Sequence, residues 1–247
     1  MANTYQAADY GTYKMSMQEP HRMLEPVEKE IAIVDEALQV LVDQGILPHR
    51  KYEQAKLLAH RAAVAQQFEI PWTAITHRMQ RLIWAINAIH RPQVMLAAGI
   101  FCGNTFISNA GAAVGPGAVY GAKDLIGIEI KPEEAERARR NVQKLDKGGV
   151  WRILAEDAVE TARKYQGQIN LLYLDADCDR GRGKGIYFDI LQTAWDKMPK
   201  GSLVLAHNSG NAAAKLEHYL AFVRDPRNCA ASVNCLVDTE GLEVTKK

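Results

Sequence analysis

An apolar run of strand length, residues 169–174, breaks abruptly into three alternating carboxylates, Asp175, Asp177 and Asp179. A run of this kind suits a central strand of a parallel sheet, which is buried on both faces. In an open α/β sheet, ligands bind at the carboxyl ends of such strands. Asp175 is therefore predicted to lie at a reaction centre, although acids that only open a solvated loop would give the same pattern.

From residue 94 onward, short apolar runs alternate with helical segments. Strands are expected at 94–98, 125–130, 150–154, 169–174 and 201–206, followed by a β pair at 231–237 and 242–245. Helices are expected through 110–113, over 131–145, up to 165, and over 187–198 and 212–222. This alternation predicts an α/β fold with a parallel sheet and right-handed crossovers.

The first ninety residues follow a helical pattern instead. Apolar residues recur at spacings of three and four after Pro26, over 51–68, and between Pro71 and Pro92. Residues 1–24 are polar and carry several Tyr and Met, which indicates a poorly ordered arm or a lid. The chain is thus predicted to divide into a helical cap over 1–90 and a catalytic domain over 91–247.

The charge balance gives no sign of a nucleic-acid or membrane partner. The 247 residues include 30 Lys and Arg against 29 Asp and Glu, a formal net charge of +1. The N-terminus has no secretory pattern, and no apolar run approaches the ~20 residues of a membrane span. Four cysteines without a C-x-x-C pair indicate reduced thiols in a cytoplasmic protein.

Each expected strand places a glycine, an acid or a polar pair at its carboxyl end. In chain order these residues are Gly99 and Gly103, Glu129, Asp157 with Ala158, Asp175, and His207 with Asn208. Scattered acids would not fall at the same edge strand after strand. An acid after the second strand typically binds a ribose diol. The pattern therefore predicts a nucleoside-type cofactor with a polar reaction centre beside it.

The glycine spacing narrows the choice of cofactor. It is G-x-x-x-G rather than G-x-G-x-x-G, and it contains no Lys for a phosphate loop. Tyr-x-x-x-Lys, which a short-chain dehydrogenase needs late in its fold, occurs only at Tyr10 and Tyr52, upstream of this loop. These features favour a mononucleoside such as S-adenosylmethionine. A methyl donor needs an aligned nucleophile that a general base or a metal deprotonates.

The motifs from about residue 70 to the C-terminus resemble the caffeoyl-CoA and catechol type of O-methyltransferase, a class I S-adenosylmethionine-dependent family. The resemblance is carried by residues 87–88, 94–105, 126–129, 174–177, 201–208, 225–227 and 240–242. Asp-Ala-Asp at 175–177 and Asp-Pro-Arg at 225–227 are its most specific parts.

The resemblance implies a Rossmann-like methyltransferase fold with a mostly parallel sheet of seven strands, the last antiparallel. It also implies a homodimer through the N-terminal helices and a small hydroxylated acceptor. Its donor-binding residues would be Gly99, Ile100, Gly103 and Thr105 at the methionine and sugar, Glu129 at the ribose, Asp157 and Ala158 at the adenine, and Asp175 nearby.

The family binds a divalent cation at the positions of Asp175, His207 and Asn208, but here the pattern departs from it. His207 replaces an Asp of the metal pair, Cys178 replaces a Lys proposed as base, and Ala97 replaces an acid of the first strand. An Asp-His-Asn set would favour Mn, Fe, Co or Zn over Mg. Alternatively, His207 is a metal-free general base or a structural residue.

The sequence therefore predicts a methyltransferase that acts on an oxygen of a small molecule. The alternatives are a binding protein that has lost catalysis, which Ala97 and Cys178 would suit, and a nitrogen or carbon methyltransferase. A basic, glycine-rich loop with Arg180, Arg182 and Lys184 lies beside the expected site, where it would grip an anionic substrate or remain solvated.

Overall fold

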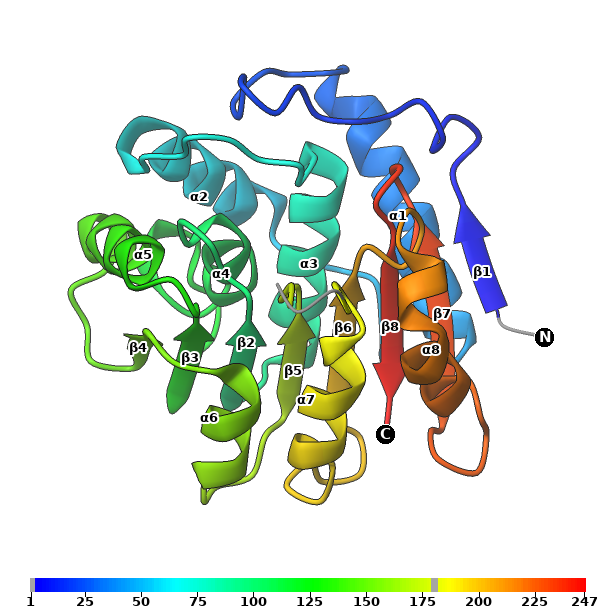
Figure 1. The fold of residues 1–247 in the computed structure, drawn as a ribbon. Coiled ribbons are helices and arrows are strands. Elements are labelled where there is room, and N and C mark those ends of the chain that lie inside the picture. Colours follow the sequence, from blue (N-terminus) through cyan, green and yellow to red (C-terminus); the bar gives the residue numbers. More distant parts are fainter. Residues whose placement is uncertain (1–2, 179–181) are drawn as a thin grey trace.

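The computed structural model describes residues 3–178 and 182–247. It has three layers, with one central sheet between two groups of helices (Figure 1). The strands are β1 (Asn3–Gln6), β2 (Val94–Ala98), β3 (Asp124–Ile128), β4 (Trp151–Leu154), β5 (Leu171–Leu174), β6 (Leu203–His207), β7 (Ala231–Leu236) and β8 (Leu242–Lys246). The α-helices are α1 (Val27–Asp43), α2 (Gln54–Gln67), α3 (His77–His90), α4 (Asn104–Ala110), α5 (Pro132–Leu145), α6 (Ala158–Lys164), α7 (Ile186–Trp195) and α8 (Glu217–Val223).

The strand order of the sheet is β1-β7-β8-β6-β5-β2-β3-β4. β8 runs antiparallel to both of its neighbours, and all other pairs are parallel. The chain moves outward in one direction from β2 to β4 and in the other from β5, so the order reverses between β2 and β5. A reversal of this kind opens a crevice at the carboxyl ends of the strands. These ends point upward in Figure 1.

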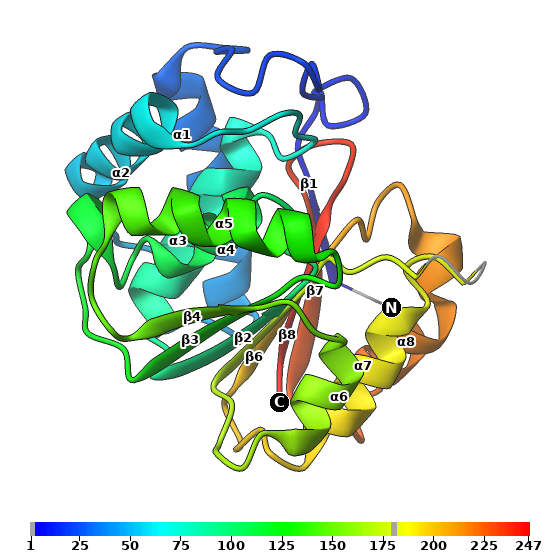
Figure 2. The same ribbon diagram turned by 60° about the vertical axis from the view of Figure 1, so that its left-hand side comes forward.

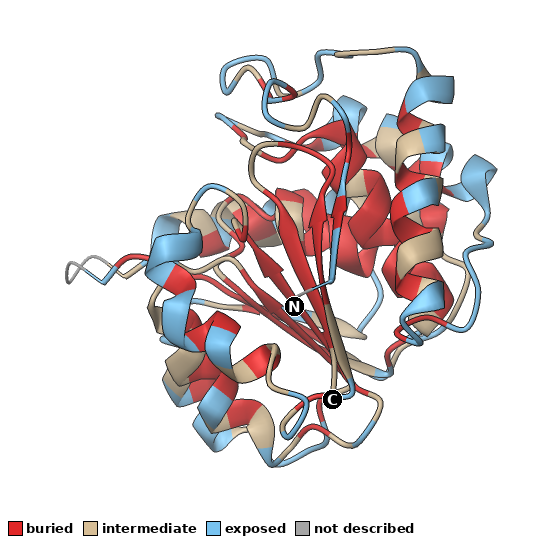
Figure 3. Ribbon diagram, turned by 90° about the vertical axis from the view of Figure 1, so that its right-hand side faces the viewer, coloured by how far each residue is buried: buried red, intermediate tan, exposed pale blue. Residues whose placement is uncertain are grey.

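Alternate residues of each strand are buried on opposite faces of the sheet. In β5, Tyr173 packs in the core cluster beneath α1 and α3, whereas Leu172 and Leu174 pack in the cluster beneath α6 to α8. Figure 2 shows α1 to α5 on one side of the sheet and α6 to α8 on the other. The central strands are buried, and the exposed residues lie on the outer surfaces of the helices, in the loops and on the edge strand β1 (Figure 3). The near-continuous apolar runs of the sequence reflect this burial on both faces.

The Rossmann-like prediction is confirmed, with one correction to the strand count. The sheet has eight strands rather than seven, because β1 adds a parallel strand beside β7, with Tyr5 opposite Cys235. β1 has little signal in the sequence, since Tyr5 is the only buried residue among its four. The segment that was expected to be a poorly ordered arm or a lid is thus anchored at its start in the sheet.

Arg78 anchors the rest of this N-terminal arm. Its side chain is fully buried in α3, where its guanidinium lies 2.7 Å from Asp9 and 2.5 Å from Glu25. The same group donates to the carbonyl of Val237 and lies 3.6 Å from the centroid of the Tyr13 ring. One cation therefore holds both ends of the 9–25 segment. A buried guanidinium needs such partners because an unpaired buried charge is strongly destabilising.

A second buried carboxylate joins the three N-terminal helices. Glu30 of α1 accepts hydrogen bonds from Arg61 of α2 and from Arg81 of α3, both at 2.6 Å. Helices α1 and α3 share their core cluster with the sheet, so the predicted cap over 1–90 packs directly on the predicted catalytic domain. None of the helices in the described ranges has the length and hydropathy that a bilayer crossing requires.

We expect Arg78→Met to lower the free energy of unfolding by about 3 kcal/mol or more, because it leaves the buried carboxylate of Glu25 with only the longer contact to Lys29, at 3.5 Å. Tryptic cleavage after Lys14 should accelerate as the arm is released. The control is Arg22→Met, which removes an exposed ion pair to Glu19 and should change the stability by no more than about 0.5 kcal/mol. Urea titration measures both variants, and equal stability losses would contradict the anchoring role.

His60 makes the fold sensitive to acid. Its ring lies against Gly111 and Gly117, and burial lowers the pKa of His60 to about 4. In the unfolded state the imidazole of His60 takes up a proton near pH 6.5, whereas in the folded state it stays neutral down to about pH 4. The stability that neutral His60 contributes is therefore present above pH 6.5 and is lost as the pH falls towards 4. The stability advantage over His60→Gln should shrink by about 2 kcal/mol between pH 7 and pH 5. Exposed His49→Gln should leave the pH profile unchanged, and parallel profiles for all three proteins would refute the assignment.

Candidate active site

The carboxyl ends of the strands bring together residues that are far apart in the sequence. Asp175 follows β5 and donates its backbone N–H to the carbonyl of Ala98 at the end of β2. His207 is the last residue of β6, and its Nδ1 lies 3.4 Å from Oδ1 of Asp175. Within the described part of the chain neither ring nitrogen of His207 has a hydrogen-bond partner, so the contact with Asp175 is electrostatic. The hydrogen-bonding capacity of this buried ring is therefore unused within the described residues.

Lys184 completes the arrangement. Its Nζ lies 2.9 Å from Oδ1 of Asp175 and 2.9 Å from the backbone carbonyl of the same residue. Cys178 and Gly183 exchange backbone hydrogen bonds, and Gly183 adopts a left-handed φ of 51°, so the chain returns to Asp175. The sequence analysis had assigned Lys184 to a basic loop that grips an anion or stays in solvent. The structure instead places it on Asp175.

The other members of that loop lie elsewhere. Arg182 forms an ion pair with Asp189 at an exposed position, and Arg180 lies outside the described residues. Nothing in the sequence pattern distinguishes Lys184 from its neighbours, because three cations alternate with glycines there.

The buried charges around Asp175 determine its ionisation. Burial by itself opposes the charged carboxylate, but Lys184 and His207 outweigh it and lower the pKa of Asp175 to about 2. Burial likewise opposes a charged His207, whereas the carboxylate of Asp175 raises the pKa of His207 above its ordinary value. Asp175 is thus an anion at neutral pH, held between two groups that favour its charge.

The side chain of Asn208 is hydrogen-bonded to the loop between β7 and β8. Its Nδ2 donates to Glu240 at 2.6 Å and to Asn211 at 3.2 Å. Its backbone is left-handed, with a φ of 65°, a conformation that Asn adopts more readily than most residues. The amide nitrogen of Asn208 is therefore engaged in hydrogen bonds to these two residues.

The residues at the predicted metal site do not fit a divalent cation in this arrangement. Lys184 already occupies the carboxylate of Asp175, and a second cation there would be repelled by the ammonium. Within the described ranges, no group of three or more His, Cys, Asp and Glu residues could hold a metal ion. The donor set of Asp175, His207 and Asn208 therefore remains a sequence-based prediction only.

The predicted donor loop lies directly beside this centre. Gly99, Phe101 and Gly103 all have left-handed backbones, with φ values of 79°, 47° and 91°. A Cβ on Gly99 would lie 2.3 Å from the backbone nitrogen of Ala176, so only glycine fits between the two chain segments. The glycine loop and the Asp-Ala-Asp motif are thus in backbone contact.

Glu129 stabilises the conformation of the loop. Its two carboxylate oxygens accept hydrogen bonds from the backbone N–H groups of Phe101, at 2.8 Å, and Lys131, at 3.1 Å. Each oxygen keeps a lone pair that could accept from a ribose hydroxyl. The ring of Phe101 stacks on Trp72 with centroids 4.6 Å apart, although Trp72 is 44% exposed. The sequence analysis missed Trp72, whose position after Pro71 had no periodic signal.

The remaining predicted donor residues have mixed surroundings. Thr105 has a buried hydroxyl without a hydrogen-bond partner in the described part of the chain, as expected for an atom that awaits a ligand. Ile100 is fully buried. Asp157 caps α6, since its Oδ1 accepts from the backbone of Val159 and Glu160, and Ala158 is the first residue of that helix. The adenine role of Asp157 and Ala158 stays a prediction.

Asp238 is a further residue that the sequence analysis did not assign. It is fully buried, accepts a hydrogen bond from the hydroxyl of Thr76 at 2.6 Å, and helps to raise the pKa of His207. Thr76 also caps α3. The segment that leads into α3 is therefore tied to the reaction centre. Only the Glu-Gly of this loop carried the family resemblance, and nothing in the pattern indicated the buried acid before it.

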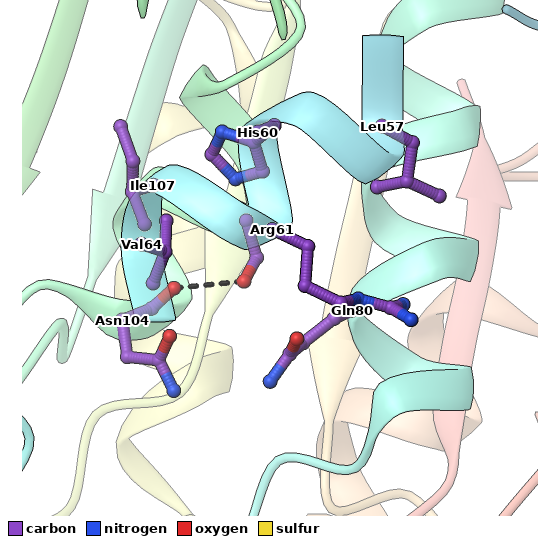
Figure 4. A pocket seen from close by; sticks show the side chains of 8 residues that line it. Leu57, His60, Arg61, Val64, Gln80, Asn104 and Ile107 are labelled. Atoms are coloured by element: carbon purple, nitrogen blue, oxygen red, sulfur yellow. Dashed lines mark hydrogen bonds between the residues drawn. The ribbon is translucent and has the colours of Figure 1, made fainter. Parts of the chain in front are cut away.

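Among the cavities that the described residues form, two border α2. The smaller, between α2, α3 and α4, holds about 10 Å³, which is room for one water molecule beside His60, Gln80 and Asn104 (Figure 4). The larger holds about 310 Å³ and is lined mostly by apolar residues between α2 and the arm at Pro20 and Met23. Neither includes Asp175 or His207 in its lining.

Residues 96–209 match the family model of a methyltransferase domain. A methyltransferase from Podospora anserina, solved with SAH bound, has a similar fold, with 14% identity, coverage of 92% of this chain and 99% of that chain, and a TM-score of 0.60. The O-methyltransferase TomG from Streptomyces achromogenes, in complex with SAM, has 18% identity, coverage of 79% and 90%, and a TM-score of 0.55. An O-methyltransferase from Bacillus cereus, in complex with SAH, has 15% identity, coverage of 90% and 100%, and a TM-score of 0.54.

No curated protein matches the sequence. The family model and the solved structures confirm the resemblance to class I methyltransferases that the motifs carry. At these identities the solved structures establish the fold, and the family model of a methyltransferase domain matches residues 96–209. The matched residues include the glycine loop, Glu129, Asp175 and His207.

We expect Gly99→Ala to lower the free energy of unfolding by about 3 kcal/mol or more, because its Cβ would collide with the backbone of Ala176. Gly45→Ala is the matched control, since Gly45 also has a left-handed φ, 70°, but lies in open space. It should cost only about 1 kcal/mol. Denaturant unfolding compares the two, and similar losses would show that the close contact is unimportant.

Proposed function

We propose that this protein transfers the methyl group of S-adenosylmethionine to a hydroxyl oxygen of a small molecule. The observation that carries the proposal is the backbone contact between the glycine loop and the Asp-Ala-Asp motif, with Glu129 on one side and the pair of Asp175 and His207 on the other. This arrangement supports a nucleoside site next to a polar reaction centre. The methyltransferase model and the SAM- and SAH-bound neighbours support the donor.

The proposed donor site uses polar groups that can still form hydrogen bonds, together with two aromatic rings. Glu129 would accept from the ribose hydroxyls while it holds the loop through Phe101. The partnerless hydroxyl of Thr105 would bond the methionine portion. The stacked rings of Trp72 and Phe101 would exclude water from one side of the donor. When bound, S-adenosylmethionine supplies an electrophilic methyl group on a sulfonium.

In this proposal His207 acts as the general base. In its neutral form an imidazole nitrogen takes the hydroxyl proton of the acceptor as the oxygen forms its bond to the methyl carbon. The bond from carbon to sulfur breaks in the same step and leaves S-adenosylhomocysteine. Asp175 stabilises the imidazolium that forms, since its Oδ1 faces Nδ1 at 3.4 Å.

The nature of the acceptor and the cellular setting are also part of the proposal. Two of the similar structures are named as O-methyltransferases, which supports oxygen over nitrogen or carbon. The four cysteines are free thiols, which supports the predicted cytoplasmic location. The homodimer through the N-terminal helices and the division at residue 90 stay predictions.

Calorimetry with S-adenosylhomocysteine tests the donor site. We expect saturable binding, and Glu129→Gln should weaken it about tenfold or more because a charged hydrogen-bond acceptor is lost. Glu133→Gln, a change of the same kind in the first turn of α5, is the control and should bind as the wild type does. The absence of any heat at millimolar ligand would refute the donor assignment.

Turnover separates the remaining alternatives. Methyl transfer from labelled donor to a panel of phenols, catechols and aliphatic alcohols is expected, and His207→Ala should abolish it while donor binding persists. Transfer only to amines or carbon acids would replace the oxygen assignment. Donor binding without transfer to any acceptor would identify a protein that binds the nucleoside but lacks catalysis.

A further inference from the structure

We propose that the ammonium of Lys184 serves as the permanent cation of the reaction centre, in the place where a divalent metal was expected from the sequence. This inference rests on the proposed methyl transfer and specifies how the acceptor oxygen is bound. Lys184 contacts Asp175, the residue to which a metal was predicted to bind, through both its carboxylate and its backbone carbonyl. The positive charge beside Asp175 is therefore supplied by a side chain of the protein rather than by a bound metal ion.

The hydrogen bonds of Lys184 leave room for an acceptor. An ammonium has three N–H donors, and Asp175 accepts two of them at 2.9 Å. The third has no partner in the described part of the chain. The Nζ also lies 5.6 Å from the centroid of the Tyr187 ring, which covers one side of it. Since His207 contacts the same carboxylate oxygen of Asp175, this third N–H can bond an acceptor oxygen beside His207.

Burial fixes the position of this charge. The side chains of Lys184 and Asp175 are only 15% and 14% exposed. The preceding Gly183 has a left-handed backbone, and its backbone bonds to Cys178 close the loop. Tyr187, at the start of α7, is fully buried and donates its hydroxyl to the carbonyl of His207 at 3.2 Å. The loop and α7 thus hold Lys184 and His207 on the same side of Asp175.

This arrangement gives each charged group a separate role. Lys184 would bind the acceptor oxygen and stabilise the negative charge that develops as His207 takes its proton. Asp175 orients both groups and neutralises the ammonium before the acceptor arrives. Because the preorganised ammonium already supplies the charge, methyl transfer by this protein requires no added metal ion.

The first experiment needs no activity. Binding of Mn²⁺ to the full-length protein, loaded with S-adenosylhomocysteine, is measured by electron paramagnetic resonance for the wild type and for Asp175→Asn. We expect both proteins to bind Mn²⁺ equally weakly, since Lys184 occupies the carboxylate. Micromolar binding in the wild type that Asp175→Asn removes would overturn the proposal.

The second experiment measures turnover after exhaustive chelation. The wild type should keep its full rate, Lys184→Met should lower kcat about a hundredfold, and Lys184→Arg should restore part of it because it keeps a charge in the same place. All three should bind S-adenosylhomocysteine with similar affinity. Arg182→Met is the matched control, since Arg182 lies in the same loop but pairs with Asp189 at the surface. It should retain the wild-type kcat.

The outcomes distinguish this inference from the proposed function. A rate that chelation abolishes, or a Lys184→Met variant as active as the wild type, would overturn the role of Lys184. A wild type that methylates no acceptor would refute the proposed function, while the Mn²⁺ comparison would still show whether Lys184 excludes a metal. Loss of donor binding in Lys184→Met alone would assign Lys184 a structural role, and this too would overturn the inference.

Discussion

The close approach of two backbone segments at Gly99 is the constraint on which the rest of the site depends. At this point the loop after β2 passes so near Asp175 and Ala176 that no side chain fits between them. The crossing fixes the position of the glycine loop relative to Asp175, and this position does not depend on flexible side chains. Glu129 then holds the loop from the other side through the N–H of Phe101. The distance between the glycine loop and Asp175 is thus determined by the main chain.

Much of the architecture could be predicted from the sequence, because the strands are buried on both faces and leave unbroken apolar runs. The polar residues at their ends also mark one edge of a parallel sheet, which is why Glu129, Asp175 and His207 could be grouped in advance. β1 escaped prediction because it is four residues long and buries only Tyr5. A strand of this size takes its stability from the neighbouring strand rather than from its own pattern.

The details of the reaction centre could not be predicted for a different physical reason. Lys184 reaches Asp175 only because the chain reverses between Cys178 and Gly183, and a reversal sets distances that no periodicity encodes. Its neighbour Arg182 looks equivalent in the sequence but pairs with Asp189 at the surface. Asp238 and Arg78 are likewise recognisable only once residues far apart in the chain have come together.

The short first strand has a consequence for how the protein meets other chains. Open sheet edges attract further strands, and proteins protect them with short or polar edge strands. Here the outer edges are β1, where Asn3, Thr4 and Gln6 are exposed, and β4, which also has four residues. The longer β7 is covered on one side by β1 and on the other by β8. The N-terminal strand therefore protects against edge-to-edge aggregation, because it covers the six-residue edge that β7 would otherwise expose.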